Sequence, residues 1–438
     1  MLRTCLALAI SIGCGAVVRA QDPLAAWPHW RGPLANGVAP KADPPVFWDA
    51  KTNIKWKAPL QGKGSATPIV WEDQVFVLTA INTGRVADPK DLPKVDPNLK
   101  VKTTAPNTYY RFVVMAFDRA TGKLRWQHTA AEMVPHEGHH ASHSYAAGSP
   151  TTDGKRLYVS FGSFGIYCYD LSGKLQWQRD LGRLNTRLGW GEAVTPVIHR
   201  DSLLLNWDQE KDSALLCLDA ATGKTRWRAD RDEKTSWNTP LVVEHKGQAQ
   251  VIVNGTKRVR SYDLKTGKEI WQIGGMTTNA IPSPVAADGI AYVMSGYGGA
   301  AGVAVPLDSK GELTDNNTLW RLTKGTPYCP SPLLLGNRLY FTATNQPLLT
   351  IVDIKTGKVL TDRERLDPAT SFYGSPVAAA GRIYLTDRTG VSLVLKAGDR
   401  VEVLATNKLD DAIDASPVAV GRQLFLRGEK HLWCIEGR

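Results

Sequence analysis

The segment DAATGKTRW, residues 219–227, contains the pattern on which the fold depends. Close copies occur at residues 118–126, 170–177 and 263–271, and weaker copies at 308–320 and 353–360. A second pattern, Ser or Thr followed by Pro and alternating apolar residues, begins at Thr67, Ser149, Thr195, Thr239, Ser283, Ser331, Ser375 and Ser416. After a first interval of 82 residues, these starting points lie 41–48 residues apart. That spacing is the length of one four-stranded propeller blade.

A single repeat, residues 195–227, has the signals of a small antiparallel sheet. The segments TPVIHR, SLLLNWD, ALLCLDA and TRWRA have the length and composition of short strands. The Pro lies at the start of the first strand, where a missing N–H costs least, and the turn ATGK places Gly223 where φ is positive. We expect Trp227 to lie between neighbouring blades and to donate its indole N–H to the backbone. The sequence therefore predicts an all-β, eight-bladed β-propeller of four-stranded antiparallel blades.

The two ends of the repeat region predict how the ring closes. Residues 416–438 supply only three strands, whereas NIKWKAPL, residues 53–60, is an outer-type strand without a blade of its own. Pairing the two removes the exposed sheet edges that an open array would leave. We therefore expect a propeller over residues 53–438, closed by an N-terminal strand, after an N-terminal extension at 21–52.

Residues 1–20 have the pattern of a secretory signal peptide: a basic Arg3, an apolar stretch and a small-residue cleavage pattern ending at Ala20. The stretch is too short to span a membrane, and no later segment is long and apolar enough. We expect an exported protein, periplasmic or extracellular, with a lipid anchor at Cys14 as the alternative. The net charge of +11 is scattered, and no nucleic-acid-binding motif is present. A protein or polysaccharide of the cell envelope is the expected partner of a monomeric chain.

Removal of residues 1–20 would leave Cys168, Cys217, Cys329 and Cys434. Three of them lie two residues before a turn Asp or Glu, at equivalent positions of different blades. Equivalent positions in adjacent blades are about 10 Å apart, the distance between packed sheets, which exceeds the reach of a disulfide. We expect all four thiols to be free, with Cys329 in an inner strand.

Three connections are longer than the repeat requires, at residues 83–110, 133–150 and 182–193. Because propeller loops alternate between two faces, all three are expected on the same face. The first is a Pro- and Lys-rich insertion in the first blade, and the second contains the run MVPHEGHHASHSYAAGSP. Long loops gathered on one face of a rigid scaffold are where function is usually located.

The histidine-rich connection suggests a metal site. His136, His139, His140, His143 and Glu137 have the N and O donors that bind zinc at about 2.0–2.2 Å. Their spacing matches no zinc signature, since H-E-x-x-H is missing. A metal site and a polar loop both remain open.

Residues that directly precede the inner strands are expected to surround the mouth of the central channel. They are Tyr145, Trp190, Glu192, Trp237, Asn238, Asn279, Tyr328, Phe372, Tyr373 and Asp414. Aromatic, amide and carboxylate groups of this kind suit a sugar, a peptide or a flat cofactor. The alternative is that they only cap a water-filled channel.

The D-x-x-T-G-K-x-x-W units resemble the tryptophan-docking repeats of the PQQ-like β-propeller family over residues 53–437. The leader WPHWRGPLANGV, residues 27–38, resembles the opening of secreted PQQ-like repeat proteins of planctomycete-type bacteria. The family includes PQQ-dependent alcohol and glucose dehydrogenases and cofactor-free scaffolds such as the outer-membrane assembly lipoprotein BamB. Membership implies the fold and leaves both functions open.

The resemblance to the dehydrogenases implies a vicinal disulfide, a calcium ion held by Glu and Asn, and a catalytic Asp. The chain has no adjacent cysteines, and Glu192 and Asn238 are the residues that could serve calcium. No G-x-S-x-G motif is present, and the recurring Asp residues belong to turns. We expect an exported, non-catalytic binding or assembly platform without a cofactor. The alternative is a quinoprotein (PQQ-dependent) oxidoreductase or a metal-dependent enzyme that uses the same face.

Overall fold

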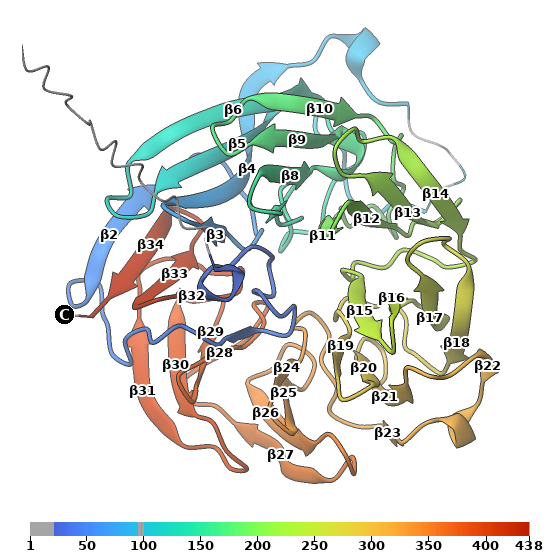
Figure 1. The fold of residues 1–438 in the computed structure, drawn as a ribbon. Coiled ribbons are helices and arrows are strands. Elements are labelled where there is room, and N and C mark those ends of the chain that lie inside the picture. Colours follow the sequence, from blue (N-terminus) through green and yellow to red (C-terminus); the bar gives the residue numbers. More distant parts are fainter. Residues whose placement is uncertain (1–21, 95–97, 99, 438) are drawn as a thin grey trace, which may run out of the picture.

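The computed structural model describes residues 22–94, 98 and 100–437, and the prediction of a signal peptide at 1–20 with a possible anchor at Cys14 lies outside them. Eight sheets, each with four antiparallel blade strands, form a ring (Figure 1), and two of them carry a fifth strand paired in parallel. This arrangement confirms the predicted eight-bladed β-propeller. None of the helices in the described residues is long and apolar enough to cross a membrane.

Each blade is a sheet whose strands follow one another outward from the channel. Blade 1 contains β3 (Ile69–Trp71), β4 (Gln74–Val86), β5 (Thr108–Asp118) and β6 (Leu124–Met133). Blade 2 contains β7 (Thr151–Thr152), β8 (Arg156–Ser160), β9 (Ile166–Asp170) and β10 (Leu175–Arg179). Blade 3 contains β11 (Val197–His199), β12 (Ser202–Trp207), β13 (Ala214–Asp219) and β14 (Thr225–Asp230). Blade 4 contains β15 (Leu241–His245), β16 (Gln248–Val253), β17 (Arg258–Asp263) and β18 (Glu269–Gly274).

The second half of the ring follows the same plan. Blade 5 contains β19 (Val285–Ala287), β20 (Ile290–Ser295), β21 (Ala301–Pro306) and β23 (Trp320–Leu322). Blade 6 contains β24 (Leu333–Leu335), β25 (Arg338–Thr342), β26 (Leu348–Asp353) and β27 (Val359–Arg365). Blade 7 contains β28 (Val377–Ala379), β29 (Arg382–Thr386), β30 (Val391–Lys396) and β31 (Val403–Lys408). Short 3-10 helices lie at η1 (Pro23–Ala25), η2 (Pro89–Asp91), η3 (Gly162–Phe164) and η4 (Asp315–Asn317).

Blade 8 joins the first and last strands of the propeller. It contains β32 (Val418–Val420), β33 (Gln423–Arg427), β34 (His431–Glu436) and, as its outer strand, β2 (Ile54–Pro59). Trp56 on β2 lies opposite Cys434 on β34 in an antiparallel pair. The predicted closure by an N-terminal strand is therefore confirmed.

Neighbouring blades are joined by the outer-strand tryptophans. Trp177 donates its indole N–H to the carbonyl of Ala220, in the turn of the next blade, at 3.0 Å. Gly223 of that turn has φ +69°, and a Cβ atom built on it would lie 2.7 Å from the Trp177 ring. Glycine is thus required there for two reasons: it adopts the positive φ angle of the turn, and its lack of a Cβ atom leaves room for the indole. The same bond and close approach recur for Trp56, Trp126, Trp227 and Trp320, which confirms the indole prediction at these positions.

Trp271 is the exception. It is fully buried, yet its indole nitrogen has no hydrogen-bond partner among the described residues. The connection that follows β21 does not form the usual turn; it forms β22 (Gly311–Leu313), which pairs in parallel with β18 beside Trp271. The indole prediction is wrong at this position because β22 replaces the turn that would have accepted the bond.

A ring of hydroxyl groups joins the inner strands around the channel. The backbone N–H of Thr67 donates to Ser149 Oγ at 2.9 Å, and Ser416 N–H donates to Thr67 Oγ1 at 3.2 Å, which connects the last blade to the first. Equivalent bonds link Ser149 to Thr195, Thr239 to Ser283, Ser283 to Ser331, Ser331 to Ser375, and Ser375 to Ser416. The Ser or Thr of the second repeat pattern therefore has a structural role that its place before Pro did not reveal.

The prediction that the cysteines are free is confirmed, but the predicted position of Cys329 is wrong. Cys168, Cys217, Cys329 and Cys434 are all free, as predicted. Cys329 does not lie in an inner strand, because β24 begins only at Leu333. The prediction of its position is wrong: the segment before Pro330 and Pro332 remains outside the sheet.

The contact between turn and indole can be tested with a matched pair of glycines. Gly223→Ala places a methyl group 2.7 Å from the Trp177 ring, whereas Gly247→Ala, at φ +80°, has no described heavy atom within 4 Å of its Cβ. Both substitutions carry left-handed backbone strain, so their difference reports the contact. We expect Gly223→Ala to lower the free energy of unfolding by about 1–3 kcal/mol more than Gly247→Ala, measured by denaturant titration. Equal losses would contradict the contact.

Acid unfolding tests the turn aspartates. Arg125 and Thr121 donate to the Asp118 carboxylate, and the Arg125 guanidinium foremost lowers its pKa from 3.8 to about 2. A pKa lowered in the folded state stabilises the protein above pH 3.8, and this contribution is lost as the pH falls toward 2. We expect Asp118→Asn to be less stable than the parent at pH 7 and equal to it near pH 2, measured by thermal unfolding. Asp410→Asn, at an exposed residue, is the control for the loss of one surface carboxylate.

Candidate functional site

The central channel holds a cavity of about 360 Å³ on the face where the long connections gather. Hydroxyl-bearing residues of the inner ring line it, among them Ser149, Ser283 and Ser375. Aromatic side chains line the wider part: Trp190, Trp237, Tyr297, Tyr328 and Tyr373. The volume and mixture of groups are those of a small-ligand or chain-end binding site.

One side of the rim is a connected aromatic cluster. The Trp190 and Tyr297 rings meet edge to face at 6.3 Å between centroids, and Tyr297 lies 4.8 Å from Tyr328. His140 contacts Trp190 edge to face at 6.1 Å. These residues come from connections of different blades, so the cluster exists only because the ring brings them together.

Another part of the rim carries an ion pair. Arg388 forms a bidentate ion pair with Asp414, at 2.7 and 3.2 Å, and its guanidinium lies 4.0 Å from the centroid of the Tyr373 ring. Ser142 is 3.1 Å from the Tyr373 hydroxyl. Asp414, which was predicted at the mouth, thus lines the cavity, and its negative charge is balanced by Arg388.

The other end of the channel is closed by the N-terminal extension. Trp27 exchanges backbone hydrogen bonds with Val70 of blade 1, and Pro28 accepts one from Thr152 of blade 2. On the far side, β1 (Val38–Ala39) pairs in parallel with β28 of blade 7. Trp30 lies between these anchors and lines the cavity. Residues 27–39 therefore cross the channel and form its floor, and we call them the plug.

Arg31 holds the plug in place. Its side chain is buried, and it donates to the carbonyls of Pro332 (2.8 Å), Pro376 (3.0 Å) and Asn36 (3.2 Å). Burial without a carboxylate partner lowers the pKa of this guanidinium to about 9. The two terminal nitrogens of this buried cation bond to backbone carbonyls and tie the plug to blades 6 and 7, whereas its Nε has no hydrogen-bond partner among the described residues.

The three long connections meet on the mouth face. Strand β4 runs to Val86 and β5 begins at Thr108, so the structured part of the predicted 83–110 insertion extends the first blade before its loop. That loop returns across residues 182–193, where Lys102 N–H donates to Leu188 O at 2.9 Å. The histidine-rich connection joins them through His140 N–H, which donates to Trp190 O at 3.0 Å.

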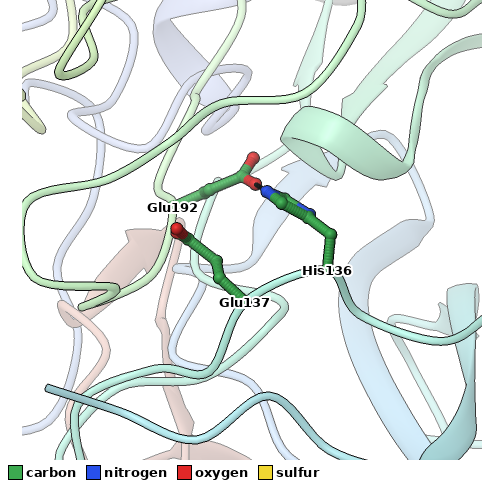
Figure 2. Close-up of side chains that lie close together, drawn as sticks. All are labelled: His136, Glu137 and Glu192. Atoms are coloured by element: carbon green, nitrogen blue, oxygen red, sulfur yellow. Dashed lines mark ion pairs between the residues drawn. The ribbon is translucent and has the colours of Figure 1, made fainter. Parts of the chain in front are cut away.

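Beneath this face, His136, Glu137 and Glu192 converge in a buried cluster (Figure 2). One donor atom from each lies within 4.8 Å of the others, and His136 Nε2 is 3.9 Å from Glu192 Oε1. Glu137 accepts from Thr186, through the hydroxyl at 2.5 Å and the N–H at 3.1 Å. Glu192 Oε2 accepts from Ser163 N–H at 2.7 Å.

Burial dominates the titration of this cluster. It raises the pKa of Glu137 to about 7 and that of Glu192 to about 8, and it lowers the pKa of His136. The backbone and hydroxyl donors oppose the shift of both carboxyls, but not enough to cancel it. At neutral pH each carboxyl is thus poised to take up a positive partner, a proton or a cation.

The other histidines of the predicted metal site lie elsewhere. His139 Nδ1 is 2.8 Å from the His140 carbonyl, and His140 Nδ1 is 2.7 Å from the Ser142 hydroxyl. His143 donates through Nε2 to the backbone of Glu192 at 3.0 Å, and burial lowers its pKa to about 4. Within the described residues, the structure brings His136 and Glu137 together with Glu192 and leaves these three histidines in the loop and cavity wall.

Five of the ten residues predicted at the mouth do not line the cavity. One is Glu192, described above, and the other four are Tyr145, Asn238, Asn279 and Phe372. Tyr145 donates its hydroxyl to Glu137 O and packs beside the buried cluster. Asn238 donates to Ser236 and to Asn254 O between the blades. Asn279 and Phe372 are buried. Adjacency to an inner strand sets the position of the backbone, whereas packing decides which side chain faces the channel.

Sequence reasoning missed Trp30, Tyr297, Arg31 and Arg388 as parts of the site. Tyr297 lies between β20 and β21, a connection that belongs to the mouth face, so the rule of alternating loops could have found it. Trp30 and Arg31 stand in the WPHWRGP leader, but the sequence alone does not say that this leader enters the channel.

A family model described as the outer membrane protein assembly factor BamB matches residues 111–310 and 162–402. The chain belongs to this PQQ-like β-propeller family. No curated protein sequence matches the chain. Among solved structures it is similar to BamB from Moraxella catarrhalis, with 14% identity, a TM-score of 0.51, and 83% of this chain and 98% of that chain covered. It is also similar to the computationally designed protein Ika8, with 12% identity, a TM-score of 0.51, and coverage of 77% and 98%. Both similarities concern the propeller fold.

The plug can be tested through Arg31. Arg31→Lys keeps a positive charge but replaces the planar guanidinium, which reaches the carbonyls of Pro376 and Pro332 through two separate nitrogens, with a single nitrogen on a shorter side chain, so the geometry of these bonds is lost. We expect a loss of about 1–3 kcal/mol in the free energy of unfolding, measured by denaturant titration. Arg400→Lys, at an exposed residue, is the control and should change stability by less than about 0.5 kcal/mol. A neutral Arg31→Lys would mean that the plug does not depend on this side chain.

Proposed function

We propose that the protein is exported and acts without catalysis as a binding or assembly platform of the cell envelope. One observation carries the proposal: the channel is a cavity closed at one end by the plug and open at the other through an aromatic rim. A closed end suits the capture of a ligand or chain end rather than passage through the ring. The assembly role in the family's description fits such a platform and comes to this chain only as part of the proposal.

The chemistry of the lining supports a partner with flat or acceptor-rich groups. Trp190, Tyr328 and Tyr373 offer faces and edges for stacking. Each ring hydroxyl that accepts a backbone N–H still has its own O–H to donate. A segment of protein or the end of a polysaccharide presents carbonyl or hydroxyl oxygens to such donors, whereas a purely apolar ligand would leave them unsatisfied.

The residues do not fit the quinoprotein alternative. Asn238 is engaged with Ser236 and Asn254, and Glu192 faces the buried cluster, so the two residues considered for calcium do not converge at the cavity. The charged group among the described lining residues is Asp414, which is paired with Arg388. PQQ carries several carboxylates, and this lining provides no free cation to balance them. We derive no reaction through that cofactor.

The binding proposal is tested by titrating the purified protein with soluble oligosaccharides and with extended peptides. We expect one class to bind, and Trp190→Ala and Tyr373→Ala to weaken binding about tenfold each, or ~1.4 kcal/mol, because each removes a stacking surface. Phe47→Ala is the matched control, since Phe47 is 51% exposed and does not line the cavity. Isothermal titration calorimetry gives the dissociation constants.

Two outcomes would overturn the proposal. A quinone absorbance band in the native protein, with turnover of an alcohol or sugar substrate, would favour the oxidoreductase. If the affinity is unchanged in Trp190→Ala and Tyr373→Ala, the binding surface lies elsewhere than in the cavity.

A further inference from the structure

The buried cluster of His136, Glu137 and Glu192 carries an inference that is independent of the proposed function. The side chains of His136 and Glu192 are only 7% and 9% exposed, and Glu137 is 9% exposed. They come from two successive connections, the one between blades 1 and 2 and the one between blades 2 and 3. Two carboxylates and an imidazole, each more than nine-tenths buried, need partners that their surroundings must provide.

Those partners are incomplete. Glu192 Oε1 and His136 Nδ1 have no hydrogen-bond partner in the described part of the chain. No Lys or Arg of the described residues forms an ion pair with Glu137 or Glu192. Glu192 Oε1 instead faces His136 Nε2 across 3.9 Å, too far for a hydrogen bond and close enough for both atoms to bind one ion (Figure 2).

We propose that this cluster is a divalent-cation site that joins the two connections beneath the mouth of the channel. Its ligands are the carboxylates of Glu137 and Glu192 and the imidazole of His136 through Nε2. In this structure the same Nε2 atom donates its N–H to the carbonyl of Leu184 at 2.7 Å. Cation binding therefore releases this proton to solvent and replaces the hydrogen bond with a metal–nitrogen bond. Ligands that share one ion at about 2.0–2.2 Å lie closer together than 3.9 Å, so binding draws the two connections together slightly.

The available space suits a single ion without much water. A void of about 10 Å³ lies beside Glu137 and Glu192, bounded by Tyr145, Phe161 and Phe164. That is roughly the room of one water molecule. His136 is not among the lining residues of this void, so an ion bound by all three ligands lies at its edge. Magnesium gives up its water reluctantly, and calcium prefers six to eight oxygens. One imidazole with two carboxylates fits zinc or manganese better, and we choose zinc.

The site would stabilise the rim rather than perform chemistry. His140 and Trp190, which line the cavity, lie in the same two connections as the ligands. Thr186 and Ser163, which donate to the carboxylates, hold the ligand oxygens in place as outer partners of metal sites usually do. An ion in this position ties the rim to the ring while remaining out of contact with a ligand in the cavity.

The test uses the full chain without a histidine tag, stripped with a chelator and titrated with Zn²⁺ by calorimetry. We expect one equivalent to bind, with Mn²⁺ weaker and Mg²⁺ weaker still, and the melting temperature to rise on binding because the ion binds only the folded state. Glu192→Gln and His136→Gln should each weaken Zn²⁺ binding at least 100-fold. His139→Gln, a histidine of the same connection outside the ligand set, should bind Zn²⁺ like the parent protein.

Several results would overturn the site. Failure of the parent protein to bind Zn²⁺ or Mn²⁺ would leave the carboxyls neutralised by protons. Loss of binding in His139→Gln with full binding in Glu192→Gln would place the ion among His139, His140 and His143 instead. Circular dichroism of the metal-free variants shows whether they are folded, and Glu192→Gln preserves the size of the side chain. Ligand binding at the cavity is measured separately, so either proposal can fail without the other.

Discussion

The contact between an outer-strand indole and the turn glycine of the next blade is the constraint on which the propeller depends. A four-stranded blade has too little buried surface to be stable alone, so its stability comes from the neighbours on both sides. Trp177 and Gly223 show how this works: the ring lies where a Cβ would be, and its N–H satisfies a turn carbonyl. The Trp of one repeat therefore contacts the turn Gly of the next repeat. The presence of either residue is explained only by the contact between two blades.

Such junctions occur at five blade boundaries of the described chain, and with the pairing of β2 and β34 that closes the ring they hold the inner strands around the channel. The hydroxyls of the inner Ser and Thr residues, apart from Thr239, accept from the backbone of the preceding blade, as in the bond from Ser416 to Thr67 that joins the last blade to the first. Most of the same residues, Ser331 excepted, line the cavity, so one set of residues both links the blades and shapes the binding surface. The plug crosses this ring and gives the channel a floor, held by a buried guanidinium that has only carbonyls for partners.

The mouth face shows how far sequence reasoning reached. Loop alternation places the long connections on one face, and Trp190, Trp237, Tyr328, Tyr373 and Asp414 do line the cavity. The same rule could not separate them from Asn238 or Phe372, which stand equally near an inner strand but turn into the core. In the histidine-rich connection, the number of imidazole and carboxylate groups suggested a metal site, whereas their spacing in the sequence matched no known zinc motif. The convergence of His136 and Glu137 with Glu192 depends on a residue about fifty positions away.

The sequence by itself determined the number of blades, their strand order and the closure by residues 53–60, because these follow from periodic local signals and from the need to pair every strand edge. It also determined that the cysteines stay free, since equivalent positions in adjacent blades are too far apart to bridge. Only the tertiary structure decided which side chains face the channel, that the leader forms a plug, and that β22 displaces the turn expected near Trp271. Those outcomes depend on contacts between segments far apart in the chain. A local sequence pattern does not determine whether a side chain points into the channel or packs into the core.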